Sequence, residues 1–143
     1  MVSESVGVEA PEQVVFHLTW CTKYRYAMLR QPRFFKACEA SLRSAAERHD
    51  MRVLELAVMS DHVHCVVACP RRLSASDAAH LLKGSSARDL FLFEPKFRKR
   101  YARGHFWARD FYARSVGAVD LATVRRYVRE DNDPRQRQLA ESN

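Results

Sequence analysis

The residues of this chain whose types and spacing suit chemistry begin with two histidines in the apolar segment 61–68. Side chains alternate between the faces of a β-strand, so His62 and His64 share one face and Val63 and Cys65 the other. The apolar second face is expected to look into a core. Two neighbouring imidazoles on the first face can hold one metal ion. A pair of half-exposed histidines without a ligand explains this segment equally well.

A second candidate group lies near the end of the chain. Tyr127 and Asp131 are four residues apart on a helix predicted from Leu121 to about Asp131, so they project from one side of it. Asp120 is the expected N-cap. A tyrosine oxygen can act as a nucleophile, and a carboxylate can bind a metal ion. The pattern by itself favours a simpler interpretation of Tyr127, an amphipathic-helix residue at the edge of the core.

The charge balance points to a polyanionic partner. The chain has 24 Lys and Arg against 17 Asp and Glu, a net charge of +7. Aromatic residues lie among these charges, notably in segment 91–101. Aromatic rings stack on bases and cations neutralise phosphates, which favours nucleic acid over a membrane surface. The same segment is also compatible with core aromatics beneath a solvated charged face.

Composition also bounds the domain and its compartment. A chain of 143 residues is most simply one domain, which we place at 13–132, with a flexible leader at 1–12 and a polar tail at 133–143. The start lacks the features of a signal peptide, and no apolar run approaches membrane-spanning length. The 4 cysteines contain no C-x-x-C pair and look like small buried hydrophobes. The expected compartment is a reducing cytoplasm.

The elements that must position these residues follow the order strand, helix, two strands, helix, two short strands and helix. The strands are predicted at 14–22, 53–59, 62–69, 105–107 and 111–113, and the first two helices begin at Pro32 and after Ser74. This order predicts an α+β fold, a ferredoxin-like antiparallel sheet with helices on one face plus a C-terminal helix carrying the tyrosine. His17, His62 and His64 are then expected on the sheet face away from the first two helices.

Five motifs in this order resemble one family, the single-tyrosine HUH transposases of IS200-like insertion sequences (the transposase A group), which move as single-stranded DNA. The resemblance covers about 13–132. The motifs are Phe16-His17-Leu18-Thr19-Trp20-Cys21-Thr22-Lys23-Tyr24-Arg25, Met59-Ser60-Asp61-His62-Val63-His64, Leu82-Lys83-Gly84-Ser85-Ser86-Ala87-Arg88, Gly104-His105-Phe106-Trp107-Ala108-Arg109 and Arg126-Tyr127-Val128.

The resemblance implies a role for each matched residue. His62 and His64 would bind a divalent metal ion, Mg²⁺ or Mn²⁺, and Tyr127 would attack DNA to form a 5′-phosphotyrosine before the strands are rejoined. Asp131 stands where the family usually has a glutamine that completes the metal site. Aspartate remains a good ligand for such ions, so the departure is compatible with a working site, a weakened site or a domesticated copy.

The resemblance also implies a homodimer and single-stranded DNA hairpins as partners, with no membrane. The residues expected to contact DNA are Lys23, Arg25, Lys83, Arg88, Lys96, Arg98, Lys99 and Arg100. Three alternatives stay open. They are a non-catalytic module that binds single-stranded nucleic acid, a hydrolase that activates water with His62, His64 and Asp131, and a domesticated HUH nuclease.

Overall fold

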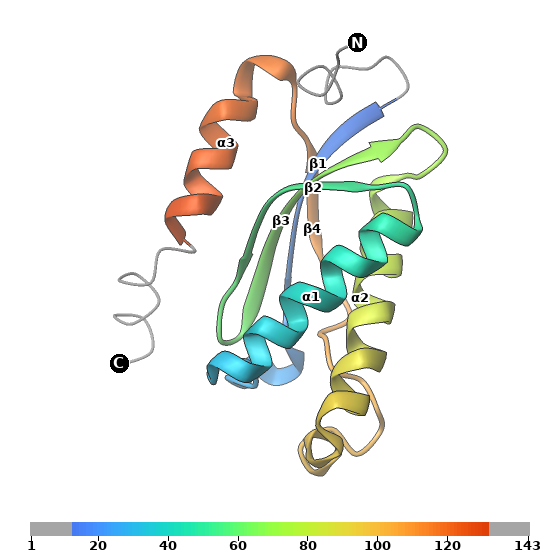
Figure 1. Ribbon diagram of the computed structural model, residues 1–143, viewed down its shortest axis with the longest axis vertical. Helices are drawn as coiled ribbons and strands as arrows, with labels where there is room; N and C mark the ends of the chain where they lie inside the picture. The colour runs from blue at the N-terminus through green and yellow to red at the C-terminus, as the bar shows by residue number, and fades with distance from the viewer. Residues whose placement is uncertain (1–12, 132–143) are drawn as a thin grey trace.

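The structure, a computed structural model, describes residues 13–131, so the predicted leader and tail lie outside the described residues. Its elements, shown in Figure 1, are β1 (Gln13–Cys21), η2 (Lys23–Arg25), α1 (Pro32–Arg48), β2 (Arg52–Val58), β3 (His62–Pro70), α2 (Ala75–Phe93), η3 (Pro95–Lys99), β4 (Tyr112–Ser115) and α3 (Ala118–Asp131). Within this part of the chain no helix is long and apolar enough to cross a membrane.

The four strands form one antiparallel sheet in the order β2-β3-β1-β4. Helices α1 and α2 lie side by side on one face, and α3 lies on the opposite side (Figure 1). The predicted α+β fold with a ferredoxin-like sheet is therefore confirmed, including the antiparallel hairpin of β2 and β3. One face of the sheet is covered by α1 and α2 and the other by α3, and the paired histidines lie on the face covered by α3.

Alternation along β1 and β3 creates two apolar clusters. The larger cluster lies under α1 and α2, and its strand residues include Phe16, Leu18, Trp20, Val63, Cys65 and Val67. The smaller cluster lies under α3 and consists of Val15, Ala57, Val66, Ala68, Val116, Val124 and Val128. Because the second cluster is built from small side chains, α3 is attached to the sheet by much less apolar surface than α1 and α2.

Local signals start the first two helices where the sequence predicted. Pro32 occupies the first turn of α1, where its missing N–H costs nothing. Ser74 caps α2 through a reciprocal pair of bonds. Its hydroxyl oxygen accepts from the Asp77 N–H, and the Asp77 carboxylate accepts from the Ser74 N–H, both at 3.0 Å.

The last third of the described chain differs from the prediction in two places. Only one of the two short strands forms, at Tyr112–Ser115 against β1, while Trp107 makes a single bridge to Thr22. Around that bridge the Lys23 N–H donates to the Phe106 carbonyl oxygen and the Ala108 N–H to the Cys21 carbonyl oxygen, and the Phe106 and Trp107 side chains are buried in the larger cluster. Helix α3 begins at Ala118, so Asp120 lies inside its first turn rather than at the N-cap, where its carboxylate still complements the helix dipole.

Candidate active site

The sheet register sets the two histidines side by side on the α3 face. Thr19 lies opposite His64 in the β1–β3 ladder, and Cys21 lies opposite His62. Val63, between the histidines, is fully buried on the other face. The alternation that the sequence predicted for this strand is therefore what the structure has.

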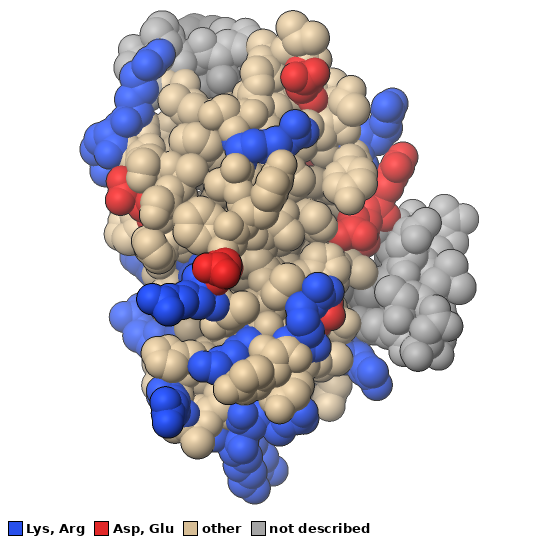
Figure 2. All heavy atoms as spheres, turned by 180° about the vertical axis from the view of Figure 1, so that it is seen from behind, with Lys and Arg blue, Asp and Glu red and all other residues tan. Residues whose placement is uncertain are grey.

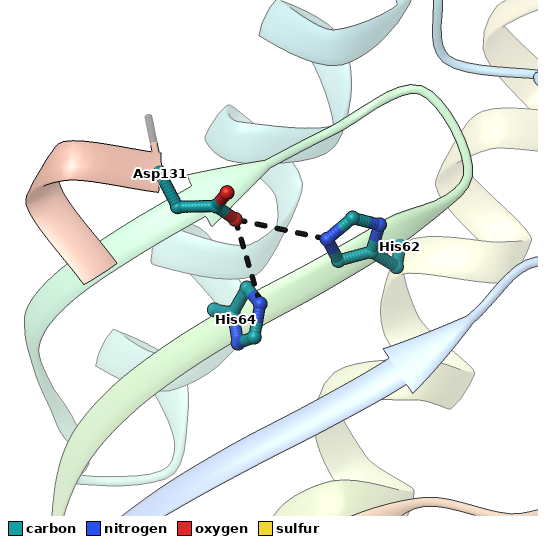
Figure 3. A group of neighbouring side chains, drawn as sticks. All are labelled: His62, His64 and Asp131. Carbon is teal, nitrogen blue, oxygen red and sulfur yellow. Dashed lines mark ion pairs between the residues drawn. The ribbon is translucent and has the colours of Figure 1, made fainter. Parts of the chain in front are cut away.

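Asp131, at the end of α3, approaches both imidazoles. Its Oδ2 atom lies 3.7 Å from His62 Nε2 and 3.4 Å from His64 Nε2, as Figure 3 shows. One ligand atom from each residue lies within 4.8 Å of the others. Oδ2 is buried and has no hydrogen-bond partner within the described part of the chain, an expensive arrangement for a carboxylate oxygen. A divalent cation would satisfy all three atoms, so these residues fit a metal ion.

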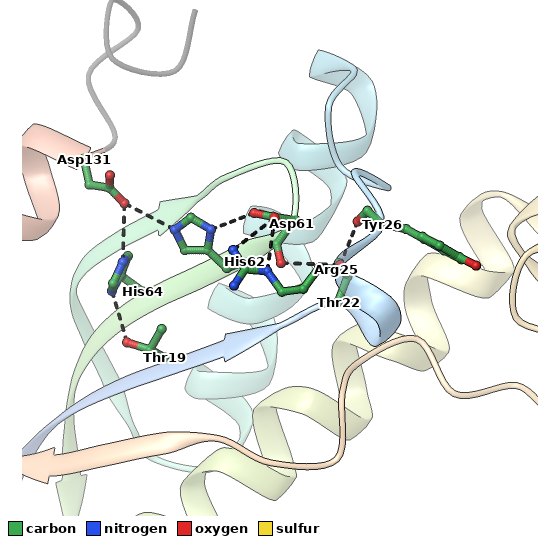
Figure 4. A network of polar contacts seen from close by, with 8 residues as sticks. All are labelled: Thr19, Thr22, Arg25, Tyr26, Asp61, His62, His64 and Asp131. Carbon is green, nitrogen blue, oxygen red and sulfur yellow. Dashed lines mark hydrogen bonds and ion pairs between the residues drawn. The ribbon is translucent and has the colours of Figure 1, made fainter. Parts of the chain in front are cut away.

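A second layer of side chains orients His62. Its Nδ1 lies 2.9 Å from Asp61 Oδ1, so the carboxylate accepts the ring proton there and leaves the Nε2 lone pair facing Asp131 (Figure 4). Arg25 donates to Asp61 Oδ2 from Nε at 3.2 Å. Burial acts to raise the pKa of Asp61, but the hydrogen bond from His62 and the Arg25 charge outweigh it and lower that pKa.

His64 is held in a comparable way from β1. Its Nδ1 lies 3.1 Å from Thr19 Oγ1 and 3.2 Å from His17 Nε2. Burial, reinforced by the neighbouring His62, lowers the pKa of His64 to about 4, so its imidazole is neutral at neutral pH. Neutral imidazole is the form that binds a metal ion. Sequence reasoning missed the supporting roles of Asp61 and Thr19, for which the only signal was their place in two of the motifs.

Tyr127 lies beside this cluster in the same chain. Its ring centroid is 5.9 Å from that of His64, edge to face, and 57% of the residue is exposed. It borders a pocket of about 350 Å³. The other residues that line this pocket are His17, Tyr112, Arg114, Thr123 and Val124. The predicted nucleophile and the predicted metal ligands are therefore brought together, with the phenol open to solvent.

An ion cluster at the edge strand β2 helps to dock α3. Glu55 Oε2 accepts from Arg125 Nε at 3.1 Å and from Arg129 at 2.9 Å. Arg125 also donates to the Leu54 carbonyl oxygen at 3.2 Å. These contacts supplement the small apolar cluster and fix the helix that carries Tyr127 and Asp131. A lone glutamate in an otherwise apolar stretch of strand was the sequence signal for this role.

The structure gives Lys83 a different role from the predicted DNA contact. Its ammonium group is buried and donates to the carbonyl oxygens of Ala108 at 2.8 Å, Arg109 at 3.1 Å and Asp110 at 3.3 Å. All three ammonium protons are thus committed to the loop that leads into β4. Burial lowers the pKa of Lys83. These contacts argue against a phosphate contact and make Lys83 a structural residue.

The other cations predicted to contact DNA are placed differently. Arg25 pairs with Asp61 beside His62, one of the candidate metal ligands, and Lys23 is half-buried in η2. Lys and Arg side chains gather at the lower end of the rear face (Figure 2). The predicted cations that are exposed around the end of α2 and η3 are Arg88, Lys96, Arg98, Lys99 and Arg100. A pocket of about 490 Å³ between α2 and the 104–109 segment includes Arg88, Arg98 and Arg109 in its lining.

The fold and the site together define an α+β protein in which a tyrosine lies beside two histidines and a carboxylate on one face of an antiparallel sheet. A family model described as "Transposase IS200 like" matches residues 11–131. The chain therefore belongs to the IS200-like transposase family, and the resemblance drawn from its motifs is confirmed.

Individual relatives agree with this assignment. The chain is 28% identical over 121 residues to the ISDra2 transposase TnpA of Deinococcus radiodurans, covering 85% of this chain and 86% of the relative. It is 29% identical over 115 residues to the transposase for insertion sequence element IS200 of Salmonella typhimurium, covering 80% and 74%.

Two solved structures share the fold. One is a crystal structure from Deinococcus radiodurans R1 whose description names a candidate transposase, with a TM-score of 0.67, 25% identity and coverage of 82% of this chain and 90% of that one. The other is a REP-associated tyrosine transposase bound to a REP hairpin, with a TM-score of 0.57, 13% identity and coverage of 80% and 64%. At that identity the second likeness concerns the fold alone.

Proposed function

We propose that this transposase cuts and rejoins single-stranded DNA through a covalent bond to Tyr127. The observation that carries the proposal is the placement of an exposed phenol beside His64, on the side where Asp131 meets both imidazoles. Family membership supports DNA as the substrate. The catalytic role of Tyr127 rests on this geometry and on the motif that contains it.

The proposed reaction proceeds in two balanced steps. The Tyr127 oxygen attacks a DNA phosphorus while the bond from phosphorus to the 3′ oxygen breaks, giving a 5′-phosphotyrosine and a free 3′-hydroxyl. The phenol gives up its proton and the departing 3′ oxygen takes one up. In the second step a 3′-hydroxyl attacks the phosphotyrosine, seals a new junction and releases Tyr127. The covalent bond conserves the energy of the phosphodiester, so no nucleotide cofactor is needed.

We assign His62, His64 and Asp131 as the ligands of a divalent metal ion, Mg²⁺ or Mn²⁺. When bound, such an ion polarises a phosphate oxygen and stabilises charge that develops on the phosphate. The support is the buried Oδ2 of Asp131, which has no hydrogen bond within the described residues, and the neutral state of His64. Asp61 and Thr19 would keep the Nε2 atoms of both imidazoles directed at the ion.

We propose DNA hairpins as the substrate and a homodimer as the working form. A protein of the same fold is described as bound to a REP hairpin, and exposed cations gather around the end of α2 in this chain. The edge strands of the sheet are β2 and β4, and a strand of a second copy could pair with either one. The cysteines carry free thiols, which supports activity in the reducing cytoplasm.

The decisive test is a denaturing gel of the protein mixed with an end-labelled single-stranded DNA hairpin and Mn²⁺. We expect a slowly migrating covalent adduct that disappears in Tyr127→Phe and on adding a chelator. Tyr112→Phe is the matched control, because Tyr112 borders the same pocket and is 56% exposed against 57% for Tyr127. An adduct that persists in Tyr127→Phe would refute the assigned nucleophile. Cleavage without any adduct would favour the water-activating hydrolase instead.

A further inference from the structure

Three tyrosines, Tyr24, Tyr26 and Tyr101, cluster at η2. The ring centroids of Tyr24 and Tyr26 are 5.4 Å apart, and Tyr26 stacks on Tyr101 at 5.7 Å with an interplanar angle of 13°. Tyr101 is buried and donates its hydroxyl proton to the Lys23 carbonyl oxygen at 2.7 Å, which anchors the cluster. Tyr24 is 65% exposed, so part of its ring is available to a ligand.

The backbone of η2 is in a rare conformation. Tyr24 and Arg25 have φ values of 63° and 56°, the left-handed region that residues other than glycine seldom adopt. Strain of this kind persists only where surrounding contacts hold it, and it is concentrated at functional sites. In Figure 4 Arg25 reaches toward Asp61 and His62, whereas Tyr26 points to the other side of the loop. The same short segment therefore serves the metal ligands and the tyrosine cluster.

The pocket beside these rings is positively charged. It has a volume of about 250 Å³, and its lining includes Tyr24, Tyr101 and the cations Lys23, Arg100 and Arg103, with no carboxylate among the lining residues. The Lys23 ammonium lies 5.4 Å from the Tyr24 ring centroid, and the Arg100 guanidinium lies 4.1 Å from that of Tyr26. Exposed aromatic faces beside cations are the combination that binds single-stranded nucleic acid.

We propose that this pocket binds an unpaired base of single-stranded DNA, stacked on Tyr24, with the flanking phosphates on Lys23, Arg100 and Arg103. The proposal rests on the DNA-cleaving function proposed above and adds a specific binding site for the strand. Because η2 also delivers Arg25 to Asp61, a strand held at Tyr24 would continue across the loop toward the metal ligands. Tyr24 would then hold a nucleotide near the cleavage point and would be a binding residue rather than a catalytic one.

The test measures binding without cleavage, using Tyr127→Phe protein in the presence of a chelator. The probes are a short fluorescent oligodeoxythymidylate and an abasic strand of equal length, which has the same phosphates but no bases. Tyr24→Asn removes the ring while keeping a residue that tolerates the left-handed backbone, and Tyr24→Phe keeps the ring as the matched control. We expect Tyr24→Asn to weaken binding of the oligodeoxythymidylate about 5- to 100-fold and to leave the abasic strand unchanged.

A second measurement uses the oligodeoxythymidylate with one 2-aminopurine, whose emission falls when the base stacks. Emission should fall on adding protein that has Tyr24 or Tyr24→Phe and stay high with Tyr24→Asn. The proposal would be overturned if Tyr24→Asn weakened binding of the oligodeoxythymidylate and of the abasic strand equally. It would also be overturned if saturating protein with Tyr24 intact left the 2-aminopurine emission unchanged. Neither measurement involves a covalent adduct. The results can therefore refute base binding at Tyr24 while Tyr127 remains the proposed nucleophile, and the gel can refute Tyr127 as the nucleophile while base binding at Tyr24 stands.

Discussion

Removing the Glu55 carboxylate tests whether the tyrosine helix is positioned by its ion cluster. Glu55 has a side chain that is only 15% exposed, and its Oε2 atom accepts one hydrogen bond from Arg125, at 3.1 Å, and one from Arg129, at 2.9 Å. Because α3 rests on a small apolar cluster, losing these bonds should release the helix from the sheet without unfolding the domain. Tyr127 and Asp131 would then lose their fixed distance from the histidines.

The size of the effect follows from the exposure of the partners. A hydrogen bond between charged groups contributes about 1.5–3 kcal/mol when buried, and an exposed ion pair about 0–1 kcal/mol. The Arg125 side chain is 37% exposed, so we assign its pair with Glu55 about 1–2 kcal/mol. The Arg129 side chain is 62% exposed, so water and salt screen its pair with Glu55, and that pair is left out of this figure. Glu55→Gln should therefore favour the detached helix by about 5- to 30-fold.

Amide hydrogen exchange measures how often α3 detaches from the sheet. In Glu55→Gln we expect protection of the Val124 and Val128 amides to fall about 5- to 30-fold, and the rate of adduct formation to fall with it. Protection of Val63, in the central strand, should stay the same. Glu130→Gln removes an equal charge from the exposed side of α3 and should change protection less than about twofold. Unchanged α3 protection in Glu55→Gln, or an equal loss at Val63, would refute the reasoning.

Two further predictions concern residues behind the site. Asp61→Asn should lower the affinity for Mn²⁺ about 10- to 100-fold by calorimetry, because the His62 tautomer is no longer fixed, and unchanged affinity would argue against that role. Lys83→Met should cost about 1–3 kcal/mol of unfolding free energy in urea, because it leaves three carbonyl oxygens without their donor. Its control, Arg88→Met at an exposed position of the same helix, should change that free energy by less than about 0.5 kcal/mol. Equal effects of the two substitutions would contradict a structural Lys83.

The sequence by itself determined the features that depend on neighbours along the chain. Strand alternation placed His62 and His64 on one face, because the two-residue period of a strand is local geometry. The reciprocal bonds of Ser74 and Asp77 set the start of α2 for the same reason. The order of elements and motifs was enough to predict the ferredoxin-like sheet and the family.

Only the tertiary structure decided which distant groups meet. Lys83 reads as an exposed helical cation until the 108–110 loop folds over it and supplies three acceptors. The 105–107 segment has the local preference of a strand but pairs with the chain after β1 through one bridge only, at Thr22 and Trp107. The approach of Asp131 to the two imidazoles and the stacking of Tyr26 on Tyr101 likewise depend on contacts between segments far apart in the chain. Local periodicity carries no information about such contacts, because they are set by how the helices pack on the sheet.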